Sequence, residues 1–130
     1  MAEFNVQKKR ERINVFKIGK GYVLKYFFDD KEIFKSLVDY YNSQTYQFEM
    51  KSVGARNKVM KYLEMKAGFD VYIVEDPTDF MVKVSKDKKY SAILKNSVDY
   101  QETKDLRIFI MKDMAAVEEA ISLGAEKYEG

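Results

Sequence analysis

The pattern of hydrophobic and polar positions predicts a β-hairpin near the start of the chain. Apolar and polar residues alternate along residues 12–18 (RINVFKI), and residues 22–28 (YVLKYFF) are rich in aromatic and β-branched side chains. Both patterns are typical of β-strands. Gly19-Lys20-Gly21 lies between the two segments, and glycine favours tight turns. We therefore expect residues 12–28 to form two antiparallel strands.

Two helices separated by a strand are predicted next. The expected elements are a helix over about residues 30–42, a strand over residues 46–51 (YQFEMK) and a helix over about residues 55–67. In the first helix the apolar residues recur at the spacing of one buried face, and Asp29 or Asp30 is the expected N-cap. The second helix is expected to end at Gly68, because glycine accepts the left-handed conformation that commonly follows a helix.

The second half of the chain is predicted to add strands and a final helix. The expected strands cover residues 69–74 (FDVYIV), 80–84 (FMVKV) and 106–112 (LRIFIMK). Between the first two, Asp76-Pro77-Thr78-Asp79 has the composition of a turn. Residues 90–94 fit either a strand or a helix, and residues 96–104 resemble a loop. Asp113 is expected to cap a helix that runs to about residue 127.

The order of these elements predicts the α+β class. Hairpins joined to single helices favour a mainly antiparallel sheet of about four to five strands, with helices packed on one face and a C-terminal helix. The other face of that sheet must then be covered by a partner or used for binding. A chain of 130 residues is one ordinary domain. We expect a flexible basic arm over residues 1–11 and a single α+β domain over residues 12–130.

The composition excludes several classes of function. The chain has no cysteine and no histidine, which excludes disulfides, thiolate or imidazole metal sites and the usual nucleophile–base pairs of catalysis. No apolar run approaches the roughly 18 residues that a membrane span needs, and the polar N-terminus does not resemble a secretory signal. We therefore expect a cytoplasmic protein that is not an enzyme and that uses no cofactor or metal. Its high lysine and glutamate content is typical of a thermophile.

Charge is distributed unevenly along the chain, although the net charge is only +2. Residues 1–28 carry seven basic and two acidic residues, whereas residues 113–130 carry one basic and five acidic residues. This asymmetry suits a basic arm or edge that meets a polyanion, with an acidic tail kept away from it. Ordinary solvated termini are the alternative interpretation.

Aromatic and basic side chains share one face of the predicted sheet. Strand alternation places Lys25, Phe27, Lys83, Arg107 and Phe109 on the face opposite the plainly apolar one. The bases of single-stranded nucleic acid stack on aromatic rings while Lys and Arg follow the phosphates. This face is therefore a candidate nucleic-acid surface. The alternative is that helices cover both faces and that these aromatic residues belong to the core.

Two basic clusters extend this candidate surface. One lies in the predicted arm, at residues 8–12 (KKRER), and the other at a predicted turn, residues 85–89 (SKDKK). Both clusters can neutralise phosphates, although a lysine-rich turn also keeps a sheet edge from pairing with another chain. The candidate nucleic-acid-binding residues are Lys8, Lys9, Arg10, Arg12, Lys25, Phe27, Tyr72, Lys83, Lys88, Lys89, Tyr90, Arg107 and Phe109.

Glu75, Asp76 and Asp79 form a tight acidic group near the end of a predicted strand. Two carboxylates with a metal ion can support phosphodiester hydrolysis, so a metal-dependent nuclease is a further alternative. The same residues surround Pro77 in an ordinary turn composition.

Two long segments resemble a known family in element order and in aromatic and basic composition. Residues 34–64 (FKSLVDYYNSQTYQFEMKSVGARNKVMKYLE) and residues 69–121 (beginning FDVYIVEDPTDFMVKVSKDKKY) are similar to the single-stranded DNA-binding proteins of thermophilic archaea, ThermoDBP and its related proteins. The resemblance implies an aromatic-lined basic cleft, binding of single strands with little sequence preference, and self-association. It transfers no binding residue position by position. The founding members of that family look like they carry a long C-terminal zipper, whereas this chain ends in one short predicted helix, so an assembly must use another surface.

A second resemblance is to the Alba chromatin proteins. Residues 13–26 (INVFKIGKGYVLKY) and 48–59 (FEMKSVGARNKV) are similar to the opening segment and the basic glycine loop of that family, which implies binding of duplex DNA or RNA as a dimer. However, Gly21 and Tyr22 replace the second lysine and the proline of the Alba pattern. Val53 and Ala55 stand where arginines are usual.

Together these features favour sequence-tolerant binding of single-stranded DNA or RNA by an aromatic and basic cleft, in a homo-oligomer. The alternatives are an Alba-like duplex binder and a protein-interaction adaptor whose aromatic face meets a partner protein. No residue pattern distinguishes DNA from RNA, because contacts to the 2′-OH leave no motif.

Overall fold

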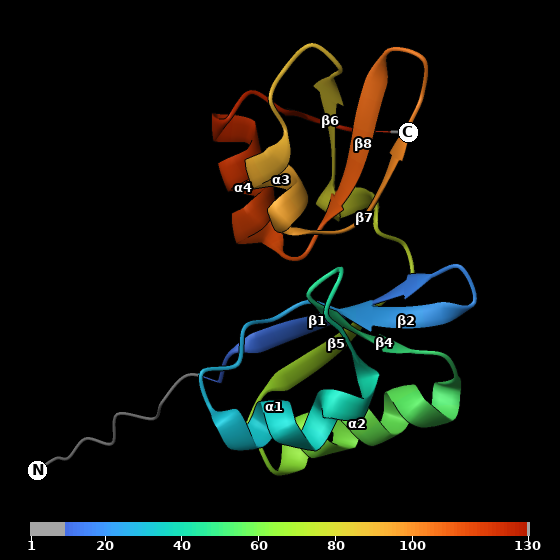
Figure 1. Ribbon diagram of the computed structural model, residues 1–130, viewed down its shortest axis with the longest axis vertical. Helices are drawn as coiled ribbons and strands as arrows, with labels where there is room; N and C mark the ends of the chain where they lie inside the picture. Colours follow the sequence, from blue (N-terminus) through green and yellow to red (C-terminus); the bar gives the residue numbers. More distant parts are fainter. Residues whose placement is uncertain (1–9, 130) are drawn as a thin grey trace, which may run out of the picture.

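The computed structural model describes residues 10–129, which fold into two lobes that lie one above the other in Figure 1. We call residues 10–75 the N-terminal lobe and residues 76–129 the C-terminal lobe. Residues 1–9 of the predicted arm lie outside the described residues. Arg10 and Glu11, also assigned to that arm, contact the N-terminal lobe instead: Arg10 forms an ion pair with Asp70 at 2.8 Å, and the Asp70 N–H donates to the Glu11 carbonyl oxygen.

The N-terminal lobe contains a five-stranded sheet in the order β3-β4-β2-β1-β5. Its strands are β1 (Arg12–Ile18), β2 (Gly21–Leu24), β3 (Tyr41–Asn42), β4 (Gln47–Met50) and β5 (Asp70–Val74). β1 and β2 form the predicted antiparallel hairpin, and its turn holds Gly19 at a φ of +60°. β5 pairs in parallel with β1, because a helix carries the chain back along the sheet between β4 and β5.

Two helices cover one face of this sheet (Figure 1). They are α1 (Lys31–Leu37), which continues into the 3₁₀ turn η1 (Val38–Tyr40), and α2 (Val53–Met65). The side chains of Asp30 and Ser52 cap α1 and α2 by accepting hydrogen bonds from N–H groups of the first turn. Gly68 follows α2 at a φ of +79°, as predicted. Apolar side chains from both layers, Leu24, Phe48 and Leu63 among them, fill the space between sheet and helices.

The C-terminal lobe contains a four-stranded sheet in the order β7-β8-β6-β9. Its elements are η2 (Thr78–Phe80), β6 (Met81–Ser85), α3 (Ser91–Lys95), β7 (Ser97–Glu102), β8 (Leu106–Met111), α4 (Met114–Ser122) and β9 (Glu126–Lys127). The pairs β6–β8, β7–β8 and β6–β9 are all antiparallel. α3 and α4 pack together on one face of this sheet (Figure 1). Asp113 caps α4, as predicted, by accepting from the Ala116 N–H at 2.8 Å.

The α+β class and the mainly antiparallel pairing are confirmed, but the strands form two sheets instead of the single sheet that was expected. The chain turns away from β5 at Pro77, and β6 then finds its hydrogen-bond partners in β8 and β9. Residues 96–104, predicted to be a loop, contain β7, which completes the second sheet. Within residues 10–129 no helix is long and apolar enough to cross a membrane.

Two further boundaries differ from the prediction. The second strand ends at Leu24 and not at Phe28, so Lys25 and Phe27 lie in the connection to α1. The last helix ends at Ser122 and not near Lys127, because Gly124 adopts a φ of +109° and directs the chain into β9.

The C-terminal lobe covers part of the sheet face that was expected to be open or to meet a partner. Phe16 of β1 and Val23 of β2 point away from α1 and α2 and belong to the same apolar core as the C-terminal lobe. The rings of Phe16 and Phe80 meet edge to face, with centroids 5.2 Å apart. The two lobes are therefore joined by a continuous apolar contact, and only the remainder of this face can hold a ligand.

Candidate ligand-binding cleft between the lobes

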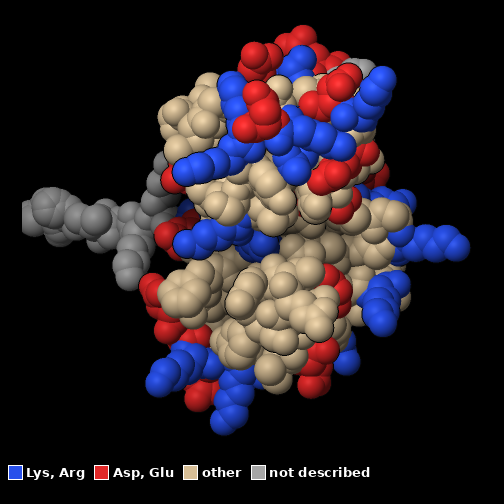
Figure 2. All heavy atoms as spheres, turned by 45° about the horizontal axis from the view of Figure 1, so that its top comes forward, with Lys and Arg blue, Asp and Glu red and all other residues tan. Residues whose placement is uncertain are grey.

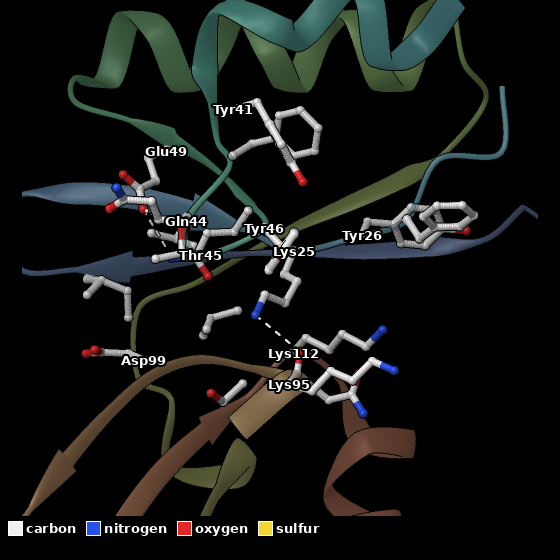
Figure 3. A pocket seen from close by; sticks show the side chains of 18 of the residues that line it. Lys25, Tyr26, Tyr41, Gln44, Thr45, Tyr46, Glu49, Lys95, Asp99 and Lys112 are labelled. Atoms are coloured by element: carbon white, nitrogen blue, oxygen red, sulfur yellow. Dashed lines mark hydrogen bonds between the residues drawn. The ribbon is translucent and has the colours of Figure 1, made fainter. Parts of the chain in front are cut away.

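A cleft of about 1600 Å³ opens between the lobes, beside the Phe16–Phe80 contact, and its lining extends to Phe34 and Tyr41 on the helix side of the N-terminal sheet. Its N-terminal wall is built from β2, β4, the turn that precedes β4 and the connection from β2 to α1. Its C-terminal wall is built from α3, the start of β7 and the residue that follows β8. Figure 3 shows this cleft with the N-terminal sheet above and the C-terminal lobe below.

Three lysines from different segments converge in the cleft. Lys25 follows β2, Lys95 ends α3 and Lys112 follows β8. The Lys25 Nζ atom donates to the Lys95 carbonyl oxygen at 3.2 Å, which joins the two walls (Figure 3). None of the three lysines forms an ion pair with a carboxylate of residues 10–129. The cleft therefore presents positive charge that is not neutralised by the described part of the chain.

The environment of Lys25 disfavours the charged form of its side chain. Burial lowers the pKa of Lys25 below the ordinary lysine value, and the positive charge of Lys112 lowers this pKa further. An anion placed between the two ammonium groups would remove that repulsion.

Exposed aromatic rings line the same cleft. Phe27 is 82% exposed and Tyr46 is 71% exposed, which are unusually high values for such large apolar side chains. Tyr100 lies on the opposite wall, with its inner side stacked on Phe109 at a centroid distance of 5.3 Å. Tyr46 is also the only described residue other than glycine with a positive φ, +58°. The cleft thus offers rings from both lobes to a planar ligand.

Carboxylates occupy defined places on both walls. Glu49 of β4 accepts hydrogen bonds from the side chains of Asn42, Thr45 and Gln47 at 3.2–3.3 Å. On the C-terminal wall, Asp99 accepts from the Tyr100 N–H at 2.9 Å. Figure 3 shows Glu49 and Asp99 on opposite sides of the cleft. Five lysines and three acidic residues line the cleft in total, so positive charge is in excess.

The cleft brings together only two of the candidate residues that the sequence pattern indicated, Lys25 and Phe27. Arg12 and Tyr72 form a separate pair on β1 and β5, with the guanidinium 3.9 Å from the centre of the ring. Arg10 is held by Asp70 on the same lobe. Lys8 and Lys9 lie outside the described residues.

The candidate residues of β6 and β8 do not form an open surface. Phe109 is completely buried under α3 and α4, so the face of β8 that was expected to be open is the core face. Arg107 is largely buried, ion-pairs with Glu102 at 3.2 Å and lies over the Tyr90 ring at 4.0 Å. These contacts stabilise the C-terminal lobe and leave Arg107, Tyr90 and Phe109 unable to receive a ligand without rearrangement.

The lysine-rich turn of the C-terminal lobe is also separate from the cleft. Lys83 lies 4.0 Å from Glu126, Lys86 pairs with Glu102 at 3.5 Å, and the Lys88 ammonium donates to the Gly124 carbonyl oxygen at 3.4 Å. Lys89 is exposed and does not line the cleft. On the face of this lobe that Figure 2 shows, basic and acidic side chains lie next to one another.

The acidic group at Glu75, Asp76 and Asp79 is a turn and not a metal site. Asp76 accepts hydrogen bonds from the Thr78 hydroxyl at 2.6 Å and from the Thr78 N–H at 3.1 Å, and these bonds lower the pKa of Asp76. Across residues 10–129 no group of three or more acidic side chains is placed to hold a metal ion.

Several cleft residues carried no signal in the sequence. Tyr46 lies in the turn before β4 and Glu49 lies in β4, and the shape of that turn follows from its side-chain contacts. Tyr100 lies in a segment that was expected to be a loop. Lys95 is the last residue of α3 and Lys112 directly follows β8, both common positions for a lysine. They share a cleft with Lys25 because of the way the lobes pack.

Comparison with models of known protein families, with curated proteins and with solved structures finds no match to this chain. The resemblances to the single-stranded DNA-binding family and to Alba remain predictions. Any function must therefore be argued from the geometry of the cleft.

Proposed function

We propose that the cleft between the lobes binds single-stranded nucleic acid, and that the protein acts by binding and not by catalysis. The observation that carries this proposal is the presence, in one cleft, of exposed aromatic rings and of three lysines that form no ion pair with an acidic residue within residues 10–129. Single strands need both features, because bases stack on rings and phosphates are neutralised by cations. Self-association as a homo-oligomer and a cytoplasmic location stay predictions of the sequence.

The size of the cleft supports a polymer as its ligand. Pockets for small molecules measure about 300–1000 Å³, whereas this cleft measures about 1600 Å³ and is open to solvent. A cleft of this size has room for more than one unit of a polymer. The rings of Phe27 and Tyr46 also favour single strands over a duplex, because the faces of paired bases are already covered by their neighbours.

The lysine arrangement supports a phosphate backbone as the charged part of the ligand. Lys25, Lys95 and Lys112 line the same cleft, the positive charge of Lys112 acts on Lys25, and partial burial of Lys25 strengthens its electrostatic interactions. Each lysine that neutralises a phosphate of a single strand adds about 0.7 to the slope of log affinity against log salt.

The proposal is tested by fluorescence polarisation with labelled single-stranded DNA, single-stranded RNA and duplex DNA over a range of salt concentrations. We expect single strands to bind more tightly than duplex. The double variant Lys95→Gln/Lys112→Gln should lower the salt slope by about 1.4. The matched control is Lys58→Gln/Lys61→Gln, because these lysines lie exposed on α2, on the opposite side of the sheet.

A second variant tests the rings separately from the charges. Phe27→Ala removes a side chain that is 82% exposed, so little stability should be lost, whereas the loss of one stacked base costs about 1–3 kcal/mol of binding. Failure of all oligonucleotides to bind at low salt would overturn the proposal. A preference for duplex would indicate an Alba-like function instead.

A further inference from the structure

Glu49 is a carboxylate whose direction is fixed by its neighbours. The Asn42 amide donates to both of its oxygens at 3.3 Å, and Thr45 and Gln47 donate to Oε2 at 3.3 and 3.2 Å. Oε2 thus accepts three hydrogen bonds, while Oε1 accepts one long bond and keeps capacity for another donor. Glu49 is half-buried and lines the cleft, so a ligand bound there can supply that donor.

The charge around Glu49 decides which kind of donor it can receive. Glu49 forms no ion pair with a lysine or arginine of residues 10–129. Lysines outnumber acidic residues along the cleft by five to three, so a cationic ligand would be repelled while an anionic chain would be attracted. The donor that fits is a neutral N–H group carried by a ligand that is negatively charged elsewhere.

Tyr46 lies three residues before Glu49, and its ring can position a ligand whose neutral N–H group then reaches Glu49. Its N–H donates to the Asn42 carbonyl oxygen at 2.8 Å, which closes the turn that also supplies two of the donors to Glu49. A left-handed backbone at a tyrosine is a strained conformation, and here it holds an exposed ring at the edge of the cleft. Single-strand recognition commonly combines a ring that stacks on a base with a polar group that reads the edge of the base.

We propose that Glu49 accepts a hydrogen bond from the exocyclic amino group of a base bound in the cleft, so that the protein prefers strands whose bases carry such a group, such as cytosine, to thymine or uracil strands, which lack it. This inference rests on the proposed function and adds base selection to it. Thymine and uracil present a carbonyl oxygen where cytosine presents its amino group, and a carboxylate repels that oxygen.

The test compares labelled oligocytidine and oligothymidine of about 12 nucleotides by fluorescence polarisation at neutral pH. Both are pyrimidine strands of equal charge, so the phosphate contacts are the same. We expect the unaltered protein to bind oligocytidine about five to ten times more tightly. Glu49→Gln should remove this preference and strengthen binding to oligothymidine, because the new amide can donate to the thymine carbonyl.

Asp29→Asn is the matched control, since Asp29 also lines the cleft and the change removes the same charge. It should strengthen binding to both strands equally and keep the preference for cytosine. If Glu49 only organises the turn, Glu49→Gln will lower thermal stability without altering the ratio of the two affinities, and the inference is then wrong. Equal binding of both strands by the unaltered protein would also overturn it while leaving the proposed function intact.

A change in the ligand provides a test that does not depend on the folding of a variant. An oligocytidine with two methyl groups on each N4 atom has no amino donor but keeps its rings and phosphates. We expect it to bind the unaltered protein as weakly as oligothymidine does. Undiminished binding would overturn the role of Glu49. Absence of binding by any strand would refute the proposed function and this inference together.

Discussion

Replacing Tyr46 by glycine should stabilise the protein and weaken its binding of single strands. Tyr46 has a φ of +58° and its ring is 71% exposed. A left-handed conformation costs a residue other than glycine about 1–2 kcal/mol, while the greater freedom of glycine in the unfolded chain costs about 0.5–1 kcal/mol. The exposed ring contributes little packing, so the net gain should be about 0.5–1 kcal/mol.

The affinity should change in the opposite direction. Loss of one base stacked on Tyr46 corresponds to about 1–3 kcal/mol, or roughly a five- to 150-fold weaker binding. Urea unfolding measures the stability, and fluorescence polarisation with oligocytidine measures the affinity. Tyr46→Phe is the control, since it keeps both the ring and the strained backbone and should leave both quantities nearly unchanged.

Either of two results would refute this reasoning. A less stable Tyr46→Gly protein would show that the ring contributes to packing and that its conformation is not strained. An unchanged affinity would show that the ring does not contact the ligand. The prediction therefore fixes the sign of two independent measurements: stability should rise and affinity should fall.

Three further predictions follow from the fold and the cleft. The pKa of Lys25 is lowered on folding, so between the folded and unfolded pKa values the unfolded chain binds more protons, and stability should rise with pH across that window. A bound phosphate should raise the pKa of Lys25 again, so the affinity for single strands should fall as pH rises there. Lys25→Arg, which stays charged, should flatten the profile when binding is titrated against pH. Gly68→Ala should lower the free energy of unfolding, measured in urea, by about 1–2 kcal/mol. The added methyl group meets no atom within 4 Å, so the cost comes only from the φ of +79°. Gly54→Ala is the control: Gly54 lies in a helix without a positive φ, so this change should be neutral or stabilising. Phe16→Ala should cost about 3–5 kcal/mol and reduce single-strand affinity at temperatures where the variant is still folded. Leu63→Ala, buried between α2 and the sheet and not part of the cleft lining, should cost about 2–5 kcal/mol of stability without that loss of affinity.

Local features of the fold were predictable because they depend on neighbouring residues. Asp30 and Asp113 are helix caps, Gly68 takes the left-handed conformation and residues 12–24 form a hairpin. Each of these follows from side-chain chemistry or backbone geometry within a few positions. The α+β class followed from the same local signals.

Features that depend on tertiary contacts were not predictable in the same way. β7 (SVDYQE) is largely exposed at the edge of its sheet and has no alternating apolar pattern. β8 is apolar on both sides, so its sequence does not show which side α3 and α4 cover, and Phe109 was placed on the wrong one. Lys25 and Phe27 were predicted as binding residues because charge and aromatic character are visible in a sequence. The residues on the opposite wall of the cleft belong to the C-terminal lobe and were not predicted.

The position of the lysines connects the architecture of the molecule with the class of its ligand. Phe16 and Phe80 hold the lobes together at one place, and beside that contact Lys25, Lys95 and Lys112 line one cleft without acidic ion-pair partners among residues 10–129. Like charges in a half-buried space oppose further closure of the lobes. A bound phosphate chain would remove that repulsion and draw both walls toward it. Binding should therefore stabilise the packing of the lobes, as any ligand that binds only the folded state does, and neutral aromatic ligands, which leave the repulsion in place, should stabilise it far less.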